Sequence, residues 1–125
     1  MDYRFPKPEH LTLQRDIDAL FLDGSRSAAV FPVRAVWREV EWSGSGPRVK
    51  VLVSVSKRKF KHAVDRNRAK RQMREAYRLN KHLLDNVLPG KGLHIGFIWL
   101  SDRPQDSAYV HKRIITLLKR ISDPS

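Results

Sequence analysis

The chain has 125 residues, 41% of them hydrophobic, no cysteine, and a formal net charge of +12 at pH 7. These values fit one folded domain spanning 1–125, and they exclude disulfides, thiolate metal sites and a disordered basic tail. No apolar run approaches the roughly 18 residues needed to span a bilayer, and the N-terminus lacks the apolar core of a signal peptide. We therefore expect a soluble, cytoplasmic protein that has no membrane partner.

The N-terminal part of the chain combines a proline-containing segment with a helical pattern. Residues 1–10 hold two prolines and predict an extended lead-in. From about 11 to 23, apolar residues recur at helical spacing, which predicts a helix. Thr12 could cap the start of this helix, and Gly24 could end it.

Two valine-rich stretches follow. Residues 28–42 hold several valines and aromatic residues among charged ones, and residues 48–56 alternate well, with valine at every second position. Both patterns are typical of strands. The Ser-Gly-Ser-Gly-Pro segment at 43–47 is a turn signal, so the sequence predicts that the two strands form a hairpin.

The second half of the chain predicts a helix, a buried strand and another helix. A long helix is expected from 63 to 84, a nearly continuous apolar strand at 93–100, and a terminal helix at 106–121. His94 lies inside the apolar strand and is expected to be a core residue. The order α-β-β-α-β-α indicates an α+β class, a single-domain α-β sandwich with a small mixed sheet packed against helices.

The positive charge is concentrated in one segment. Residues 57–81 carry eleven Lys or Arg against two acids, Asp65 and Glu75, which gives +9 of the total +12. The rest of the chain holds fourteen basic and eleven acidic side chains. A concentrated basic block within a foldable sequence indicates a polyanionic partner, and we expect nucleic acid.

The long helix separates into two faces when each residue advances by about 100°. The face expected to be buried holds Ala69, Met73, Ala76, Leu83 and Leu84, with Tyr77 at its edge. The opposite face holds Asn67, Lys70, Arg71, Arg74, Arg78 and Lys81. Like charges at i,i+4 cost a few tenths of a kcal/mol per pair, a cost that a bound polyanion would relieve. Six arginines between Arg58 and Arg78 favour phosphate groups, onto which a guanidinium can fork.

The segment from Val55 to Arg78 resembles the protein subunit of bacterial ribonuclease P. The family signature is a Ser-Lys segment at the end of a strand, an Arg-Asn-Arg element, then Lys-Arg and a further Arg on the helix. These parts stand here in order as Ser56-Lys57, Arg66-Asn67-Arg68, Lys70-Arg71 and Arg74. The resemblance covers roughly residues 11–121.

The resemblance implies an α-β sandwich with a left-handed βαβ crossover, although right-handed crossovers are the rule in proteins. It also implies an endoribonuclease that hydrolytically removes the 5′ leader from precursor tRNA. In that complex the catalytic RNA subunit carries out the chemistry with Mg²⁺ bound mainly by RNA and substrate, so no catalytic or metal-binding residue is expected on the protein. A 1:1 complex of protein and RNA is expected.

Residue roles follow from the same resemblance. The positions expected to contact RNA are Ser56, Lys57, Arg58, Lys59, Lys61, Arg66, Asn67, Arg68, Lys70, Arg71, Arg74 and Arg78. The cleft expected to hold the leader uses Ile17, Phe21 and Arg34.

The sequence departs from the family pattern at three places. The connection at 59–62 lacks the usual glycine, and Ile17 and Arg34 stand where aromatic residues are usual. We therefore expect leader binding to rely less on stacking and more on charge.

Alternative functions make different demands on the sequence. A structural RNA-binding protein of the ribosomal type would need the same basic surface and no processing role. An independent nuclease would need clustered carboxylates, but Asp16 and Asp18 cannot share a helix face. Trp37 and Trp42 could be stacking platforms for bases or edge-strand aromatics without a function, whereas Trp99 is expected in the core.

Overall fold

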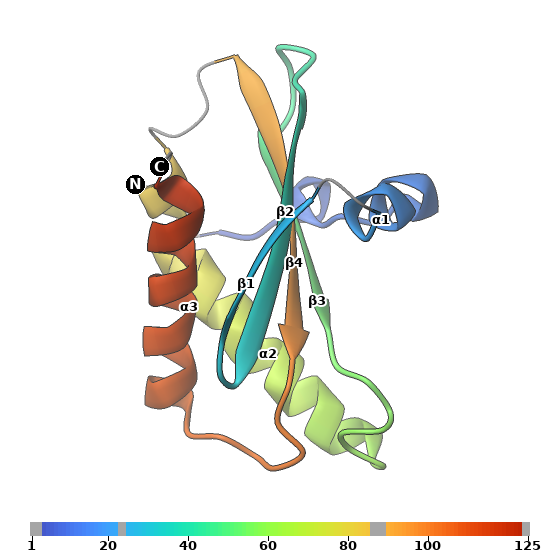
Figure 1. The fold of residues 1–125 in the computed structure, drawn as a ribbon, viewed down its shortest axis with the longest axis vertical. Helices are drawn as coiled ribbons and strands as arrows, with labels where there is room; N and C mark the ends of the chain where they lie inside the picture. The colour runs from blue at the N-terminus through green and yellow to red at the C-terminus, as the bar shows by residue number, and fades with distance from the viewer. Residues whose placement is uncertain (1–3, 23–24, 86–89, 124–125) are drawn as a thin grey trace.

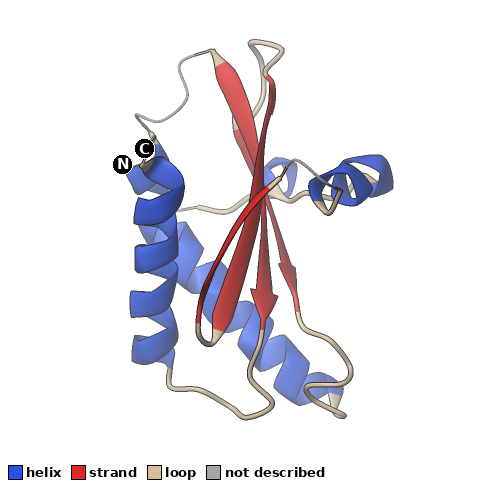
Figure 2. Cartoon of the chain, in the orientation of Figure 1, coloured by secondary structure: helices blue, strands red, loops and turns tan. Residues whose placement is uncertain are grey.

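The computed structural model describes residues 4–22, 25–85 and 90–123. These residues form a four-stranded sheet with two long helices, α2 and α3, on one side and the short helix α1 on the other (Figures 1 and 2). None of the helices in the described part is long and apolar enough to cross a membrane.

The elements follow one another from η1 to α3. The helices are η1 (Lys7–Glu9), α1 (Gln14–Leu20), α2 (Ala63–Asn80), η2 (Lys81–Leu84) and α3 (Ser107–Ser122), of which η1 and η2 are 3-10 helices. The strands are β1 (Arg26–Val30), β2 (Val33–Glu41), β3 (Val49–Ser54) and β4 (Lys91–Trp99). Asp106 caps α3, since its carboxylate accepts the N–H of Ala108 at 3.1 Å.

The strand order is β1-β2-β4-β3, so β4 lies in the middle of the sheet, as its apolar run predicts. β3 and β4 are parallel, whereas the other neighbouring pairs are antiparallel. The chain passes from β3 to β4 through α2, which makes a βαβ unit in a mixed sheet. The α+β class and the sandwich are confirmed, and the hand of this crossover stays a prediction of the family resemblance.

The predicted hairpin is wrong. The stretch at 28–42 forms two strands, because a turn at Phe31 and the cis-bonded Pro32 separates β1 from β2. These two strands form the hairpin, and β2 pairs on its other side with β4. β3 pairs with β4 instead, since the apolar β4 needs a neighbour on each side. The order therefore gains one strand and becomes α-β-β-β-α-β-α.

The first helix is shorter than the predicted range of 11–23. Leu11 donates its N–H to the carbonyl of Val51 at 2.9 Å, and His10 bridges the same residue. This segment is extended because it covers part of the free edge of β3, and α1 begins after it. Thr12 therefore does not cap the helix, and Gly24 lies outside the described residues.

The two faces of the sheet carry separate hydrophobic clusters. The large cluster lies under α2 and α3 and includes Trp37 and Trp99, so the structure places Trp37 in the core rather than on a binding surface. The small cluster lies under α1 and consists of Leu11, Leu20 and Val36, with Ile17, Leu52 and Ile98 packed against it.

Gly96 of β4 lies beneath the end of α1. A Cβ atom placed there would lie 3.2 Å from Cδ2 of Leu20 and 3.4 Å from Cζ of Phe21. The absence of a side chain at this position therefore allows the end of α1 to lie close against the sheet.

Candidate nucleic-acid interface

Helix α2 presents two faces, as the sequence predicts. Its buried residues are Ala69, Met73, Ala76 and Tyr77. Tyr77, expected at the edge of this face, is only 1% exposed, and burial raises the pKa of its hydroxyl far above the usual value. The opposite side, here called the α2 basic arc, consists of Asn67, Lys70, Arg71, Arg74, Arg78 and Lys81. Within the arc Asn67, Arg71 and Arg74 are exposed and the others are half-buried.

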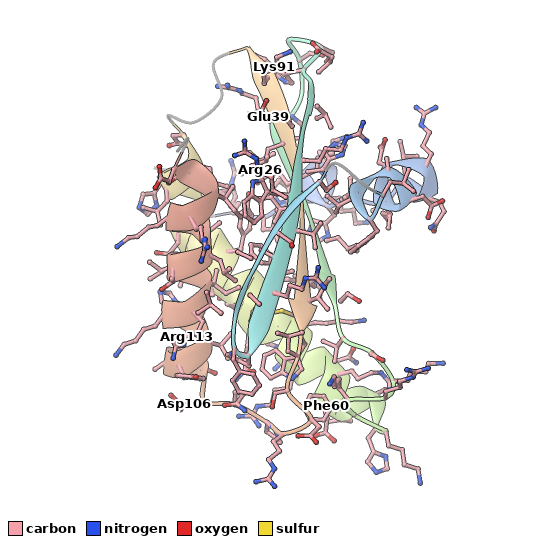
Figure 3. All side chains as sticks on the ribbon, in the orientation of Figure 1. Arg26, Glu39, Phe60, Lys91, Asp106 and Arg113 are labelled. Carbon is pink, nitrogen blue, oxygen red and sulfur yellow. The ribbon has the colours of Figure 1, made fainter. Side chains whose placement is uncertain are left out.

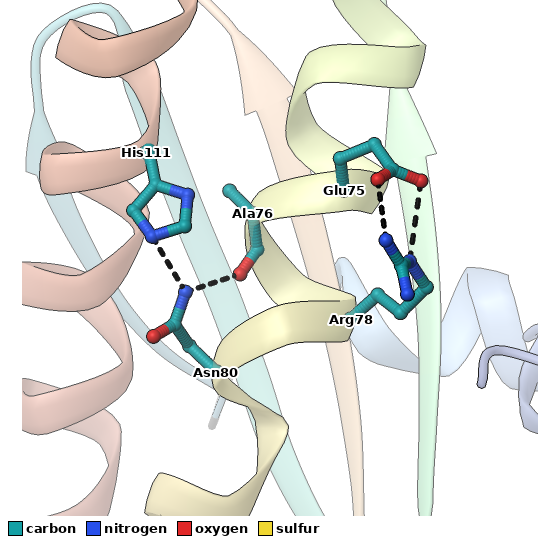
Figure 4. A network of polar contacts seen from close by, with 5 residues as sticks. All are labelled: Glu75, Ala76, Arg78, Asn80 and His111. Carbon is teal, nitrogen blue, oxygen red and sulfur yellow. Dashed lines mark hydrogen bonds and ion pairs between the residues drawn. The ribbon is translucent and has the colours of Figure 1, made fainter. Parts of the chain in front are cut away.

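The C-terminal end of the arc is partly neutralised by acids of the same chain. Arg78 pairs with Glu75 at 2.7 Å (Figure 4), and this hydrogen-bonded pair raises the pKa of Arg78 and lowers that of Glu75. Lys81 pairs with Glu9 at 2.9 Å and also donates to the carbonyl of Arg4. Lys81 therefore holds the N-terminal segment against the helix rather than facing outward.

Three cations in the arc have no such partner. Lys70, Arg71 and Arg74 form no ion pair with any acid of the described chain. They lie on one side of the helix within about one turn, so their positive charges reinforce one another. This acid-free group gives α2 a surface that attracts anions.

The two arginines of the Arg-Asn-Arg element point in different directions, because i and i+2 are about 200° apart on a helix. Arg66 is half-buried, and its Nη1 donates to the carbonyl oxygens of Phe60 at 2.8 Å and Lys61 at 3.0 Å. Arg68 is exposed on the other side of the helix. Arg66 thus ties down the connection before α2, and Arg68 is free to meet a partner.

The connection before α2 is itself basic. Phe60 is buried beside the first turns of α2 (Figure 3), with its ring centroid 6.3 Å from that of Trp99. This anchor and the Arg66 hydrogen bonds hold the segment in place where the family usually has a glycine. Its polar residues stay available: Ser56, Lys57, Arg58 and Lys61 are exposed, and Lys59 is half-buried.

A pocket on the other side of the sheet contains two of the three residues expected in the leader cleft. Phe21, 48% exposed, and Arg34 line a cavity of about 270 Å³ together with Leu20, Leu22, Ser25, Ser27, Val36 and Ile98. Ile17 does not line this pocket and packs in the small cluster under α1. The guanidinium of Arg34 reaches the hydroxyl of Ser27 at 3.5 Å.

His94 does not lie in the core, where it was expected. It is half-buried on the α1 side of the sheet, and burial lowers the pKa of its imidazole. The alternation of β4 could have revealed this, because His94, Gly96 and Ile98 share one face while Ile95 and Phe97 face the main core.

Neither Trp42 nor the carboxylates form an evident binding site in the described chain. Trp42 is half-buried, with the guanidinium of Arg48 lying 5.2 Å from its ring centroid, so one face of the indole is already covered. Among residues 4–22, 25–85 and 90–123, no three His, Asp or Glu side chains come close enough to hold a metal ion.

Helix α3 supports the interface from behind. Asn80 of α2 donates to the carbonyl of Ala76 at 2.8 Å and lies 3.1 Å from Nε2 of His111 on α3 (Figure 4). Gln72 donates to the carbonyl of Gln105 at 2.8 Å and to the hydroxyl of Ser107 at 2.9 Å. These contacts fix α2 with its basic arc turned away from α3.

Comparisons with known proteins agree with this geometry. The family model described as Ribonuclease P matches residues 5–122. The chain is 42% identical to the ribonuclease P protein component of Porphyromonas gingivalis over 121 residues, which is 93% of this chain and 85% of the relative. It is 32% identical to the component of Thermotoga petrophila, covering 97% and 98% of the two chains. The solved RNase P protein of Thermotoga maritima superposes with a TM-score of 0.68 at 27% identity, covering 90% of this chain and 96% of that one. This chain belongs to the ribonuclease P protein family.

Proposed function

We propose that this chain is the protein subunit of a ribonuclease P ribonucleoprotein. It binds the catalytic RNA through the α2 basic arc and the connection before α2, and it binds the 5′ leader of precursor tRNA in the pocket of Phe21 and Arg34. The observation that carries the proposal is the acid-free group of Lys70, Arg71 and Arg74 beside an exposed basic connection.

The basic arc suits a structured RNA. Arg71 and Arg74 can each fork onto the phosphate oxygens of a folded backbone, which a lysine cannot do with the same geometry. Phosphates would also remove the repulsion between Lys70 and Arg74, which are four residues apart. Because α2 is held by the core and by α3, little ordering of the protein is needed on binding.

The pocket on the α1 side suits a single-stranded segment. The exposed ring of Phe21 offers one aromatic surface for a base, and Arg34 offers a charge for a phosphate or a second flat surface. Ile17 is half-buried against the small cluster and has no aromatic ring, so stacking rests on Phe21 alone. Leader binding in this chain then depends more on charge than on stacking.

Hydrolysis of the leader bond is assigned to the RNA. Mg²⁺ prefers oxygen ligands and keeps several waters, and phosphate oxygens of the two RNAs supply such ligands. The described residues do not fit an all-protein magnesium site, since no three carboxylates or histidines gather. The role proposed for the protein is to neutralise backbone charge and hold the leader, so that the complex cleaves at lower magnesium than the RNA alone.

The test is reconstitution with the cognate catalytic RNA and cleavage of precursor tRNA at low Mg²⁺. The wild-type protein should increase the cleavage rate, and Arg71→Ala combined with Arg74→Ala should lose most of that increase. Lys112→Ala combined with Lys119→Ala is the matched control, because both lysines are exposed on α3 and the charge removed is the same.

Two results would contradict the proposal. Equal losses in the arc variant and the control would mean that only net charge matters. RNA binding without any gain in cleavage would favour the structural, ribosomal-type alternative.

A further inference from the structure

The face of the sheet under α1 carries only one sign of charge. Its charged residues are Arg34 and Arg38 on β2 and Lys50 on β3, and His94 on β4 can become positive. The four strands lie entirely within the described residues, and none of them places an Asp or Glu on this face. Glu39 and Glu41 alternate onto the other side of β2.

Three of these residues form a row across the sheet. Arg38 pairs in register with His94, and His94 pairs with Lys50, so the three lie on adjacent strands about 5 Å apart. They share the α1 side of the sheet with Val36 and Leu52, which are two positions away on the same strands and pack in the small cluster. Arg38 is exposed, and the other two are half-buried. This row is called the cross-strand cationic row.

The row lies on the same face as the Phe21–Arg34 pocket but at the other end of α1. Four residues separate Arg34 from Arg38, which is about 13 Å along a strand. The basic connection before α2 begins near the pocket, since it follows Ser54 at the end of β3. Ser54 is in register with Ile98, which lines the pocket. The row is therefore farther from the surface that meets the catalytic RNA.

We infer that Arg38, Lys50 and His94 form a second anion subsite, which takes phosphates of leader nucleotides lying farther from the cleavage point than those in the pocket. This inference rests on the proposed function. We favour the leader over the catalytic RNA as the occupant. The α2 basic arc, which is proposed to bind the catalytic RNA, lies on the opposite side of the sheet. A positive track interrupted by an exposed aromatic ring is the usual way to hold single-stranded RNA.

Asp16 of α1 limits the affinity of this subsite. It is half-buried and interacts electrostatically with His94, opposing the effects of burial, Arg38 and Lys50, which all lower the pKa of the imidazole. Near neutral pH the imidazole is then uncharged and offers a single N–H donor. A phosphate in the row would favour the protonated ring, so binding there should take up a proton.

The experiment compares precursor tRNAs with a long and a short leader in binding to the reconstituted holoenzyme. The wild type should bind the long-leader precursor more tightly. Arg38→Ala combined with Lys50→Ala should reduce that preference by about tenfold, through loss of two charge-assisted contacts, and leave short-leader affinity unchanged. Asp16→Asn should increase the preference, and Lys112→Ala combined with Lys119→Ala should leave it as in the wild type.

His94→Gln gives an independent readout. The preference of the wild type for the long leader should grow as the pH falls below neutral, and the variant should lose this pH dependence.

The inference is overturned if the row variant keeps the wild-type preference or weakens both precursors equally. A holoenzyme that binds both precursors with the same affinity also overturns it, while a protein that neither assembles with the RNA nor aids cleavage overturns the proposed function itself. Circular dichroism of each variant checks that it is folded.

Discussion

The two faces of the sheet differ in almost every respect. One is covered by α2 and α3 and buries the large cluster, including Phe97 and Trp99. The other is covered by a seven-residue helix, has a small cluster with three buried residues in the described chain, and leaves Arg34 and Arg38 exposed to solvent. The first face supplies most of the apolar burial that stabilises the fold, and the proposed leader pocket lies on the second. β4 serves both, since its residues alternate between them.

The largest expected effect is a difference in stability between substitutions at two neighbouring residues of β4, one on each face of the sheet. Phe97→Ala should lower the free energy of unfolding by about 3–5 kcal/mol, because a fully buried aromatic ring is replaced by a cavity. Ile98→Ala, at a half-buried position, should cost about 1–2 kcal/mol. Urea unfolding followed by circular dichroism measures both, and equal losses would mean that the two faces contribute alike to stability.

A smaller effect on the stability of the free protein should distinguish Arg66 from Arg68, the two arginines of the Arg-Asn-Arg element. Arg68→Ala should weaken binding of the catalytic RNA by about 1–3 kcal/mol and leave the stability of the free protein within about 0.5 kcal/mol. Arg66→Ala should weaken RNA binding to a similar degree and also destabilise the protein by about 1–2 kcal/mol, because two carbonyl oxygens lose their donor. Unchanged RNA affinity in both variants would remove the assignment of the signature to the RNA interface.

The smallest effect is a pH dependence on the open face. The pKa of His94 is lowered in the folded protein, so below neutral pH the unfolded chain binds more protons than the native one. The free energy of unfolding should therefore fall as the pH drops from about 7 to about 5, through the usual range of histidine. His94→Gln should reduce this fall, as measured by urea unfolding of the free protein at both pH values. A variant with the same pH dependence as the wild type would show that another group is responsible.

The periodicity of apolar residues predicted those features of the structure that are determined within a single helix or strand. The two faces of α2, the central position of β4 and the last helix all follow from spacing of apolar residues. The apolar pattern showed that β4 is central but not which strands are its neighbours. Pairing between strands depends on which neighbour buries more surface, and local patterns do not contain that information. The break at Pro32 was missed because the valine pattern continues on both sides of it.

The sequence predicted which residues make up the basic surface but not which of them bond to other parts of the chain. Charge counts identified the basic segment, and helical angles placed Lys70, Arg71 and Arg74 on one side. The same reasoning could not show that Arg66 bonds to the connection before it or that Lys81 pairs with Glu9, since these partners come from outside the helix. His94 was assigned to the core because the run was interpreted as apolar on both faces, without using the alternation that places His94 on the open face.

Gly96 touches no RNA in the proposed complex, yet it affects where the ring of Phe21 can lie. A Cβ atom at this position would press on the side chain of Leu20 and reach the ring of Phe21, so the two side chains would have to shift by a few tenths of an ångström. The position of the one exposed ring in the proposed leader pocket thus depends on a side chain that β4 does not have. A residue contributing neither charge nor stacking can in this way affect a base that stacks on Phe21 in the proposed complex.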